Sequence, residues 1–168
     1  MLRRVFVALL LACSTAVVRA DTVRVGDRVP EFSLASKDGG TVATADLRGK
    51  VVCLDFWATW CATCKAALPA LDALARRPGF ENVRFLAVNV DRDGEVADRW
   101  LAQNLPGAKM TVLRDDGGAL LARFGAAGMP ALYVIDRDGV VRHVEAGYET
   151  AALKQVETAL DSLVTPRP

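Results

Sequence analysis

The sequence is poor in histidine, and its charges nearly cancel. His143 is the single histidine among 168 residues, which excludes a multi-histidine metal site. The formal net charge is +1, from 21 basic and 20 acidic residues, and it falls to about −2 without Arg3, Arg4 and Arg19. Such a chain has no general attraction to nucleic acid or to an anionic membrane. We therefore expect no nucleic-acid partner, no metal and no other cofactor.

The N-terminus lacks an apolar run long enough to span a bilayer as a mature helix. Residues 1–4 include two arginines, and the apolar run that follows ends near Ala12. A transmembrane helix needs about 20 apolar residues. Val18-Arg19-Ala20 fits the small-x-small pattern of a cleavage site. We expect residues 1–20 to be a signal peptide and residues 21–168 to form one domain.

Cys13 allows a different interpretation of the same N-terminal segment. Leu10-Leu11-Ala12-Cys13 resembles a lipoprotein box, in which Cys13 would be lipidated and would anchor the protein to a membrane. Leu11 is a less usual residue in such a box, and the apolar segment would be very short, so we favour soluble export. In both cases the protein leaves the reducing cytoplasm, for the periplasm or another exported location, where a disulfide can persist.

Cysteine is also scarce, but two of the four cysteines stand three residues apart. An apolar run typical of a buried strand, residues 51–54, precedes Cys61, and apolar residues at helical spacing follow Cys64. The helix dipole favours a thiolate at this junction. We assign Cys61 as nucleophile and Cys64, one turn on and more buried, as the residue that resolves the mixed disulfide. A structural disulfide or half of a zinc site is the alternative, although zinc usually needs four ligands.

The remaining periodicity predicts an α/β fold with a mixed sheet and helices on both faces. Internal repeats and linkers are lacking, and the length suits one domain with a full core. The predicted segments, in chain order, are a hairpin at 31–34 and 40–42, a strand from 51, a helix at 61–76, a strand at 83–90, a helix around 96–101, a short strand at 109–113, a short helix at 119–124, two strands at 131–136 and 140–146, and a last helix at 150–163.

The cysteine segment resembles the active-site segment of thioredoxin, and the wider chain is similar to the exported TlpA/ResA-like branch of that family. The resemblance rests on Leu54-Asp55-Phe56-Trp57-Ala58-x-Trp60-Cys61-x-x-Cys64-Lys65, with support from Asp46 to Val52, Val88 to Asp91, and Gly128-Met129-Pro130 followed by Val134 to Gly139. It implies a thioredoxin fold, a central mixed sheet flanked by helices on both faces, with an N-terminal β-hairpin extension.

The resemblance also implies roles for four residues near the cysteines. Pro130 should follow a cis peptide bond beside Cys61, and the Met129 backbone should pair with an extended substrate peptide. Trp60 forms either an apolar rim around the sulfur or a packed aromatic. Asp55 stands where thioredoxin carries its buried aspartate, and we expect it to have a raised pKa and to accept the Cys64 proton. The competing interpretation of Asp55 is a structural carboxylate, kept ionised by hydrogen bonds to the backbone or to a buried water, with no part in the chemistry.

We expect several other residues, among them Cys53 and His143, to take no part in the thiol chemistry. We expect Cys53 to be a buried, inert thiol and Trp57 to be core. His143 is incidental to the cysteine pair, and Asp91 and Asp93 are solvated loop acids. The pair Ala62-Thr63 between the cysteines brings no histidine to stabilise a thiolate, which argues against a strongly oxidising enzyme.

These features predict an exported thiol–disulfide oxidoreductase acting as a reductase on protein thiol and disulfide clients. The resemblance suggests cytochrome c haem-attachment thiols or copper-site cysteines as clients, and a membrane thiol protein as electron donor. An oxidase or isomerase is the runner-up. A thiol peroxidase is a weaker alternative, suggested by the lead-in Gly26-Asp27-x-Val29-Pro30-x-Phe32. A non-catalytic module that holds metal between the two thiols is another.

Overall fold

The structure is a computed structural model that describes residues 22–147 and 150–165. The predicted signal peptide and Cys13 lie outside the described residues. The elements follow one another as β1 (Ser33–Ala35), β2 (Thr41–Ala43), the 3₁₀ helix η1 (Thr44–Leu47), β3 (Val51–Trp57), α1 (Ala62–Ala75), β4 (Val83–Asn89), α2 (Gly94–Asn104), β5 (Thr111–Arg114), α3 (Ala119–Phe124), β6 (Ala131–Ile135), β7 (Val141–Ala146) and α4 (Thr150–Val164).

Five strands form the central sheet in the order β5-β4-β3-β6-β7. β3 pairs with β4 in parallel, and β4 pairs with β5 in parallel. β6 runs antiparallel to both β3 and β7. The predicted mixed sheet is therefore confirmed, with β3 at its centre and β5 and β7 at its edges.

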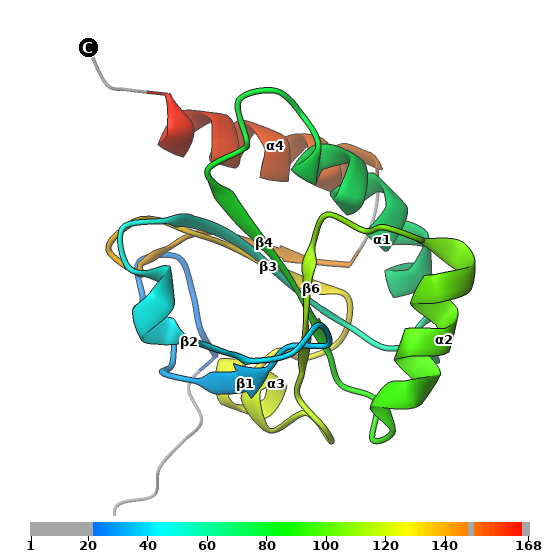
Figure 1. Ribbon diagram of the computed structural model, residues 1–168. Coiled ribbons are helices and arrows are strands. Elements are labelled where there is room, and N and C mark those ends of the chain that lie inside the picture. The colour runs from blue at the N-terminus through cyan, green and yellow to red at the C-terminus, as the bar shows by residue number, and fades with distance from the viewer. Residues whose placement is uncertain (1–21, 148–149, 166–168) are drawn as a thin grey trace, which may run out of the picture.

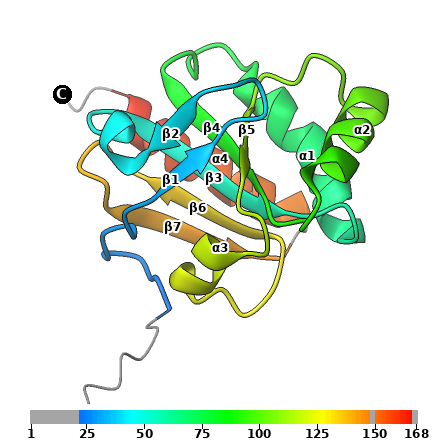
Figure 2. The ribbon, with the colours of Figure 1, turned by 60° about the horizontal axis from the view of Figure 1, so that its bottom comes forward.

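Helices cover both faces of this sheet, as Figures 1 and 2 show. The connections β3-α1-β4 and β4-α2-β5 are parallel crossovers, which are almost always right-handed and so place both helices on the same face. α4 lies on that face as well, while α3 and the β1–β2 hairpin cover the opposite one (Figure 2). The expected helices on both faces and the expected N-terminal hairpin are both confirmed.

The core is densest around β3, whose seven residues are all buried. On the face towards α3, the ring of Phe56 lies 5.1 Å from that of Phe124 and 6.2 Å from that of Tyr133. Edge-to-face contacts of this kind add to the area that aromatic rings bury. Because β3 is held from both edges and both faces, the chain segment that leaves its carboxyl end starts from a fixed point.

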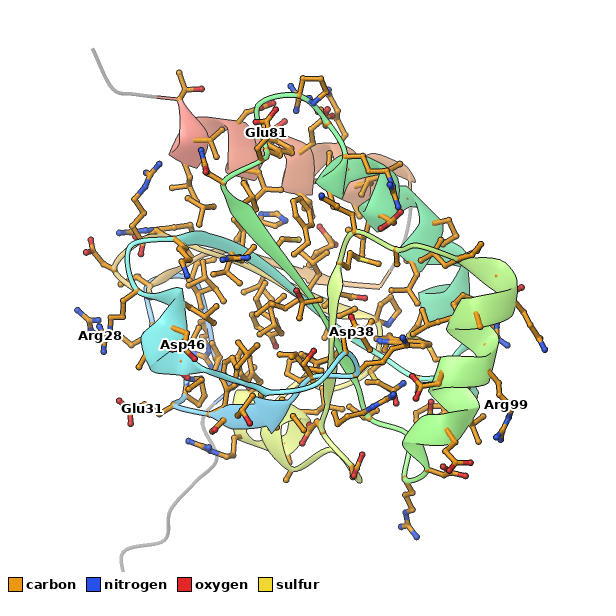
Figure 3. The ribbon with its side chains drawn as sticks, in the orientation of Figure 1. Arg28, Glu31, Asp38, Asp46, Glu81 and Arg99 are labelled. Atoms are coloured by element: carbon orange, nitrogen blue, oxygen red, sulfur yellow. A yellow bond between two sulfur atoms is a disulfide. The ribbon has the colours of Figure 1, made fainter. Side chains whose placement is uncertain are left out.

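The surface carries the charged side chains, several of which project around the outline of the molecule in Figure 3, among them Glu81, Arg28 and Arg99. Within the described residues, no helix is both long enough and apolar enough to cross a bilayer.

The β1–β2 hairpin turns through Gly39 and Gly40, whose φ angles of 97° and 75° favour glycine. Ser36 bridges from this hairpin to Leu113 of β5, so the hairpin shields the β5 edge.

Candidate active site

The two cysteines lie where the chain passes from the end of β3 into the start of α1. Trp57 ends the strand, residues 58–60 form a short loop, and Cys61 is the N-cap residue of α1. The Cys61 sulfur takes the place that a serine or aspartate oxygen usually takes at an N-cap, accepting a hydrogen bond from the backbone N–H of Cys64 at 3.2 Å. A helix N-terminus favours negative charge, and a thiolate at this sulfur would receive that stabilisation.

Cys61 and Cys64 are joined by a disulfide, with an S–S distance of 2.05 Å. They differ in access, since Cys61 is 8% exposed and Cys64 is fully buried. An incoming thiol or disulfide therefore reaches Cys61 more easily than Cys64. This asymmetry suits the two roles that the sequence assigns to them.

Cys53 is the free cysteine among the described residues, and it is buried in β3. Burial, and then the neighbouring Asp55, raise the pKa of the Cys53 thiol. A thiol that resists ionisation is a poor nucleophile. The expectation that Cys53 is a buried, inert residue agrees with this position.

An open groove of about 660 Å³ runs beside the cysteine loop. Trp60 and Met129 line it, together with Val96 of α2 and Leu121 of α3. The Trp60 side chain is 69% exposed, so the alternative of a packed aromatic is wrong for this residue. Trp57 is fully buried against Trp100, with ring centroids 5.6 Å apart, and its assignment to the core is confirmed.

The Met129–Pro130 peptide bond is cis, as the resemblance led us to expect. Met129 faces the groove, whereas Pro130 lines a different, small pocket that also contains Asp55. The segment that opens β6 therefore separates two environments, one facing the solvent beside Trp60 and one facing the interior beside Asp55.

Asp55 lies in the middle of β3 and is 2% exposed. Neither carboxyl oxygen has a hydrogen-bond partner among the described protein groups. Burial raises the pKa of Asp55 well above its ordinary value, because an ionised carboxylate loses its hydration there. A structural carboxylate kept ionised by backbone hydrogen bonds from the described residues does not match this environment, whereas the expected rise in pKa agrees with it.

Asp91 is a correction to the sequence-based prediction, because it is not a solvated loop acid. It is 5% exposed, and its carboxylate accepts hydrogen bonds from the Thr59 backbone N–H at 3.0 Å, the Thr59 hydroxyl at 3.1 Å and the Asn89 side-chain amide at 2.9 Å. These bonds tie the loop before Cys61 to the end of β4. The sequence offered one signal, since Asn89 ends a buried strand and Asp91 follows it two residues later.

Asp93 is exposed, as expected, but it also has a structural role. Its side chain accepts a hydrogen bond from the Glu95 N–H at 2.9 Å and caps α2.

His143 lies on β7, where its Nε2 atom is 3.4 Å from Glu145 Oε2. Within residues 22–147 and 150–165, no three or more His, Cys, Asp or Glu side chains gather in a metal-binding arrangement.

Comparison with known proteins places this geometry in a recognisable context. The family model described as Redoxin matches residues 24–160. The thiol:disulfide interchange protein DsbE of Pseudomonas fluorescens is 34% identical over 124 residues, covering 73% of this chain and 67% of that protein. The thiol-disulfide oxidoreductase ResA of Bacillus anthracis is 28% identical over 130 residues, covering 77% and 74%.

A solved structure resembles the whole described domain. The crystal structure of a candidate DsbE thiol:disulfide interchange protein from Chlorobium tepidum superposes with a TM-score of 0.79 at 32% identity, covering 86% of this chain and all of that one. The predicted resemblance to ResA-like thioredoxin-fold proteins is confirmed by these relatives.

We predict that Asp91→Ala will destabilise the protein and loosen the cysteine loop. The change leaves the half-buried Thr59 N–H and the buried Asn89 amide without this acceptor, at a cost of about 1–3 kcal/mol for such groups. Urea unfolding should show the loss, and amide hydrogen exchange should be faster at Thr59 than in the wild type. The exposed Asp116→Ala is the matched control. Equal stability of the two variants would contradict the role given to Asp91.

Proposed function

This chain belongs to the Redoxin family and is a thiol–disulfide oxidoreductase of the ResA/DsbE type, and from that premise we propose that it works as a disulfide reductase on protein clients outside the cytoplasm. The observation that carries the proposal is the asymmetry of the cysteine pair. Cys61 is the accessible N-cap sulfur, and Cys64 is buried one turn behind it.

The reaction begins with the reduced pair. The Cys61 thiolate attacks one sulfur of a client disulfide, forming a mixed disulfide and releasing the other client sulfur as a thiolate. Asp55 then accepts the Cys64 proton, and the Cys64 thiolate attacks the Cys61 sulfur. The Cys61–Cys64 disulfide forms, the client leaves as a thiolate, and two electrons have passed to the client. A donor thiol protein must reduce the pair again before another turnover.

The reductive direction is supported by the residues between the cysteines. Ala62 and Thr63 bring no positive charge towards the Cys61 sulfur, and the Thr63 hydroxyl, 3.4 Å from that sulfur, is a neutral group. A strongly oxidising dithiol depends on a strongly stabilised thiolate. With the helix N-terminus and no histidine, the thiolate receives moderate stabilisation, which favours donating electrons. An oxidase or isomerase role is the second candidate of this class.

The groove beside Trp60 supports a protein client. Its solvent-facing walls include the exposed Trp60 ring and the Met129 segment, where an extended client chain could pair with the backbone. By the family resemblance, we propose haem-attachment thiols of cytochrome c or the cysteines of a copper site as clients. A membrane thiol protein would supply the electrons.

Export is part of the proposal. We propose that residues 1–20 are removed as a signal peptide and that residues 21–168 act in the periplasm or an equivalent exported compartment. Lipidation of Cys13, which would tether the same domain to a membrane, is the alternative.

The decisive experiment is client trapping. Cys64→Ser removes the resolving thiol, so Cys61 should remain bound to its client as a mixed disulfide. Mass spectrometry of an extract of the exported proteins should then find a set of protein clients attached through Cys61. The Cys61→Ser variant is the control and should capture none. An empty trap in both variants, together with peroxide turnover by the wild type, would replace this function with a thiol peroxidase.

We predict that Cys61 is the reactive thiol of the reduced protein. Its pKa should lie in the range of about 3.5–7.5 seen for helix-N-terminal and Cys-x-x-Cys thiols. Iodoacetamide labelling as a function of pH, followed by peptide mapping, should modify Cys61 first and leave Cys53 and Cys64 protected. Labelling of Cys61 and Cys64 at the same rate would contradict the assignment of the nucleophile.

A further prediction concerns Asp55→Asn and the second step of the reaction. In the wild type, resolution should speed up as the pH rises through the raised pKa of Asp55, because only the ionised carboxylate accepts a proton. The amide cannot do so, and resolution should slow by about 10²-fold or more.

The measurement uses reduced protein and 5,5′-dithiobis(2-nitrobenzoate). The first phase of thionitrobenzoate release reports attack by Cys61, and the second phase reports resolution by Cys64. Asp55→Asn should change the second phase and leave the first nearly intact. If the second phase kept its wild-type rate at every neutral pH, Asp55 would have no part in the reaction.

A further inference from the structure

Asp55 has a second carboxyl group as its neighbour across the sheet. In the strand register, Asp55 of β3 lies opposite Leu132 of β6, and Leu132 lies opposite Glu145 of β7. Residues directly opposite each other share a face of a sheet. Asp55 and Glu145 therefore stand in one row, on the face that α1 and α4 cover, with Leu132 between them.

The same two carboxyl groups line one small pocket. Its volume is about 10 Å³, close to the space that a single water molecule requires. Asp55 and Glu145 supply its acidic side chains. The other lining residues are glycine, proline or apolar: Ala67, Leu71, Pro130, Leu132, Gly147, Ala152, Leu153 and Val156.

The pocket leads from the interior to the surface. Asp55 at its inner end is buried, and neither of its oxygens has a hydrogen-bond partner within residues 22–147 and 150–165. At the outer end, the Glu145 side chain is 22% exposed on the edge strand, and Gly147 is exposed. A water in this pocket would have carboxyl groups on both sides, which supplies the polar partners that a buried water needs.

We propose that Glu145 is a positioning residue that holds a water molecule against Asp55 and so gives the Asp55 proton a route to solvent. The proposal rests on the role of Asp55 as the base in the proposed function. It adds a residue on β7, distant in sequence from the cysteine pair, to the machinery of the second step.

The proton balance of that step defines what the water does. When Cys64 attacks the mixed disulfide, its proton passes to the Asp55 carboxylate. When the client has left as a thiolate, Asp55 holds this proton beside a disulfide that cannot accept it, so its release needs a polar route to solvent. The water in the pocket accepts the Asp55 proton and passes it outwards past Glu145, while hydrogen bonding from the water stabilises the Asp55 carboxylate that results.

The other titratable groups near Asp55 do not line the pocket, so the route past Glu145 is the polar route from Asp55 to solvent. Cys53 on the same strand and the Cys61–Cys64 pair at the head of α1 are thiols or a disulfide. β6 and α4 present apolar side chains to the pocket, and β7 presents Glu145 with His143 beside it. Glu145 is thus the group whose replacement alters the polarity of the pocket without touching sulfur.

The test is the pH dependence of the second phase of thionitrobenzoate release. Glu145→Leu removes the polar wall, so the ionised form of Asp55 loses its water, and the pH midpoint of the second phase should rise by about one unit. Glu145→Gln retains a group that binds water and should recover most of that shift. The first phase should be unchanged in both variants.

A second approach fills the pocket from the opposite wall. Ala152→Val adds two methyl groups from α4 while Glu145 stays in place. It should shift the midpoint in the same direction as Glu145→Leu, and it keeps the test valid if the leucine variant does not fold. Glu81→Leu, on the connection between α1 and β4 and outside the pocket, is the matched control and should match the wild type.

The outcomes separate this inference from the proposed function. A wild-type midpoint in the folded pocket variants would overturn the role of Glu145. An equal change in Glu145→Gln and Glu145→Leu would overturn the water route, and an equal fall of the midpoint would assign the effect to the lost negative charge, which no longer opposes ionisation of Asp55. A wild-type second phase in Asp55→Asn would instead withdraw the base itself, whatever Glu145 does.

Discussion

The pairing of β3 on both of its edges is the constraint on which the site depends. All seven of its residues are buried, β4 holds one edge in parallel and β6 holds the other in antiparallel pairing. A strand fixed in this way cannot slip, because a shift of one residue would turn Asp55 and Cys53 to the opposite face. The positions of the Cys61 loop above it and of the Asp55 carboxyl within it are therefore set together.

Two buried acids, Asp55 in β3 and Asp91 just after β4, show how the surroundings of a carboxyl group decide between a chemical and a structural role. Asp91 accepts three hydrogen bonds from Thr59 and Asn89, and its charge is used to hold the loop in place. Asp55 has no such donors in the part of the chain that the structure describes, and burial raises the pKa of its carboxyl group. A carboxyl group that is costly to ionise opposes folding more as the pH rises above its unfolded pKa. That cost is understandable where proton transfer is needed, and it has no structural benefit.

The sequence predicted most of the fold because its signals were local. The apolar run of β3, the helix from Ala62 and the glycine turn of the hairpin each follow from residues close together in the chain. Asp91 was misjudged for the opposite reason. Its partner Thr59 is brought to it by the parallel pairing of β3 with β4, and an acid after a strand looks the same whether it faces solvent or a loop.

Glu145 was missed for a related reason, since it lies ninety residues after Asp55 in the chain and reaches it through two strand registers. Sequence patterns around a cysteine motif draw attention to the loop that carries the sulfur, where access and helix dipole act. In the proposed route, however, the proton leaves along the same face of the sheet, towards the edge strand β7. A dithiol site needs a dry, buried resolving thiol and also an outlet for its proton, and these demands conflict within one loop. Placing the sulfur chemistry at the head of α1 and the polar outlet at the edge strand β7 satisfies both, because β3 and β6 separate the two without breaking the core.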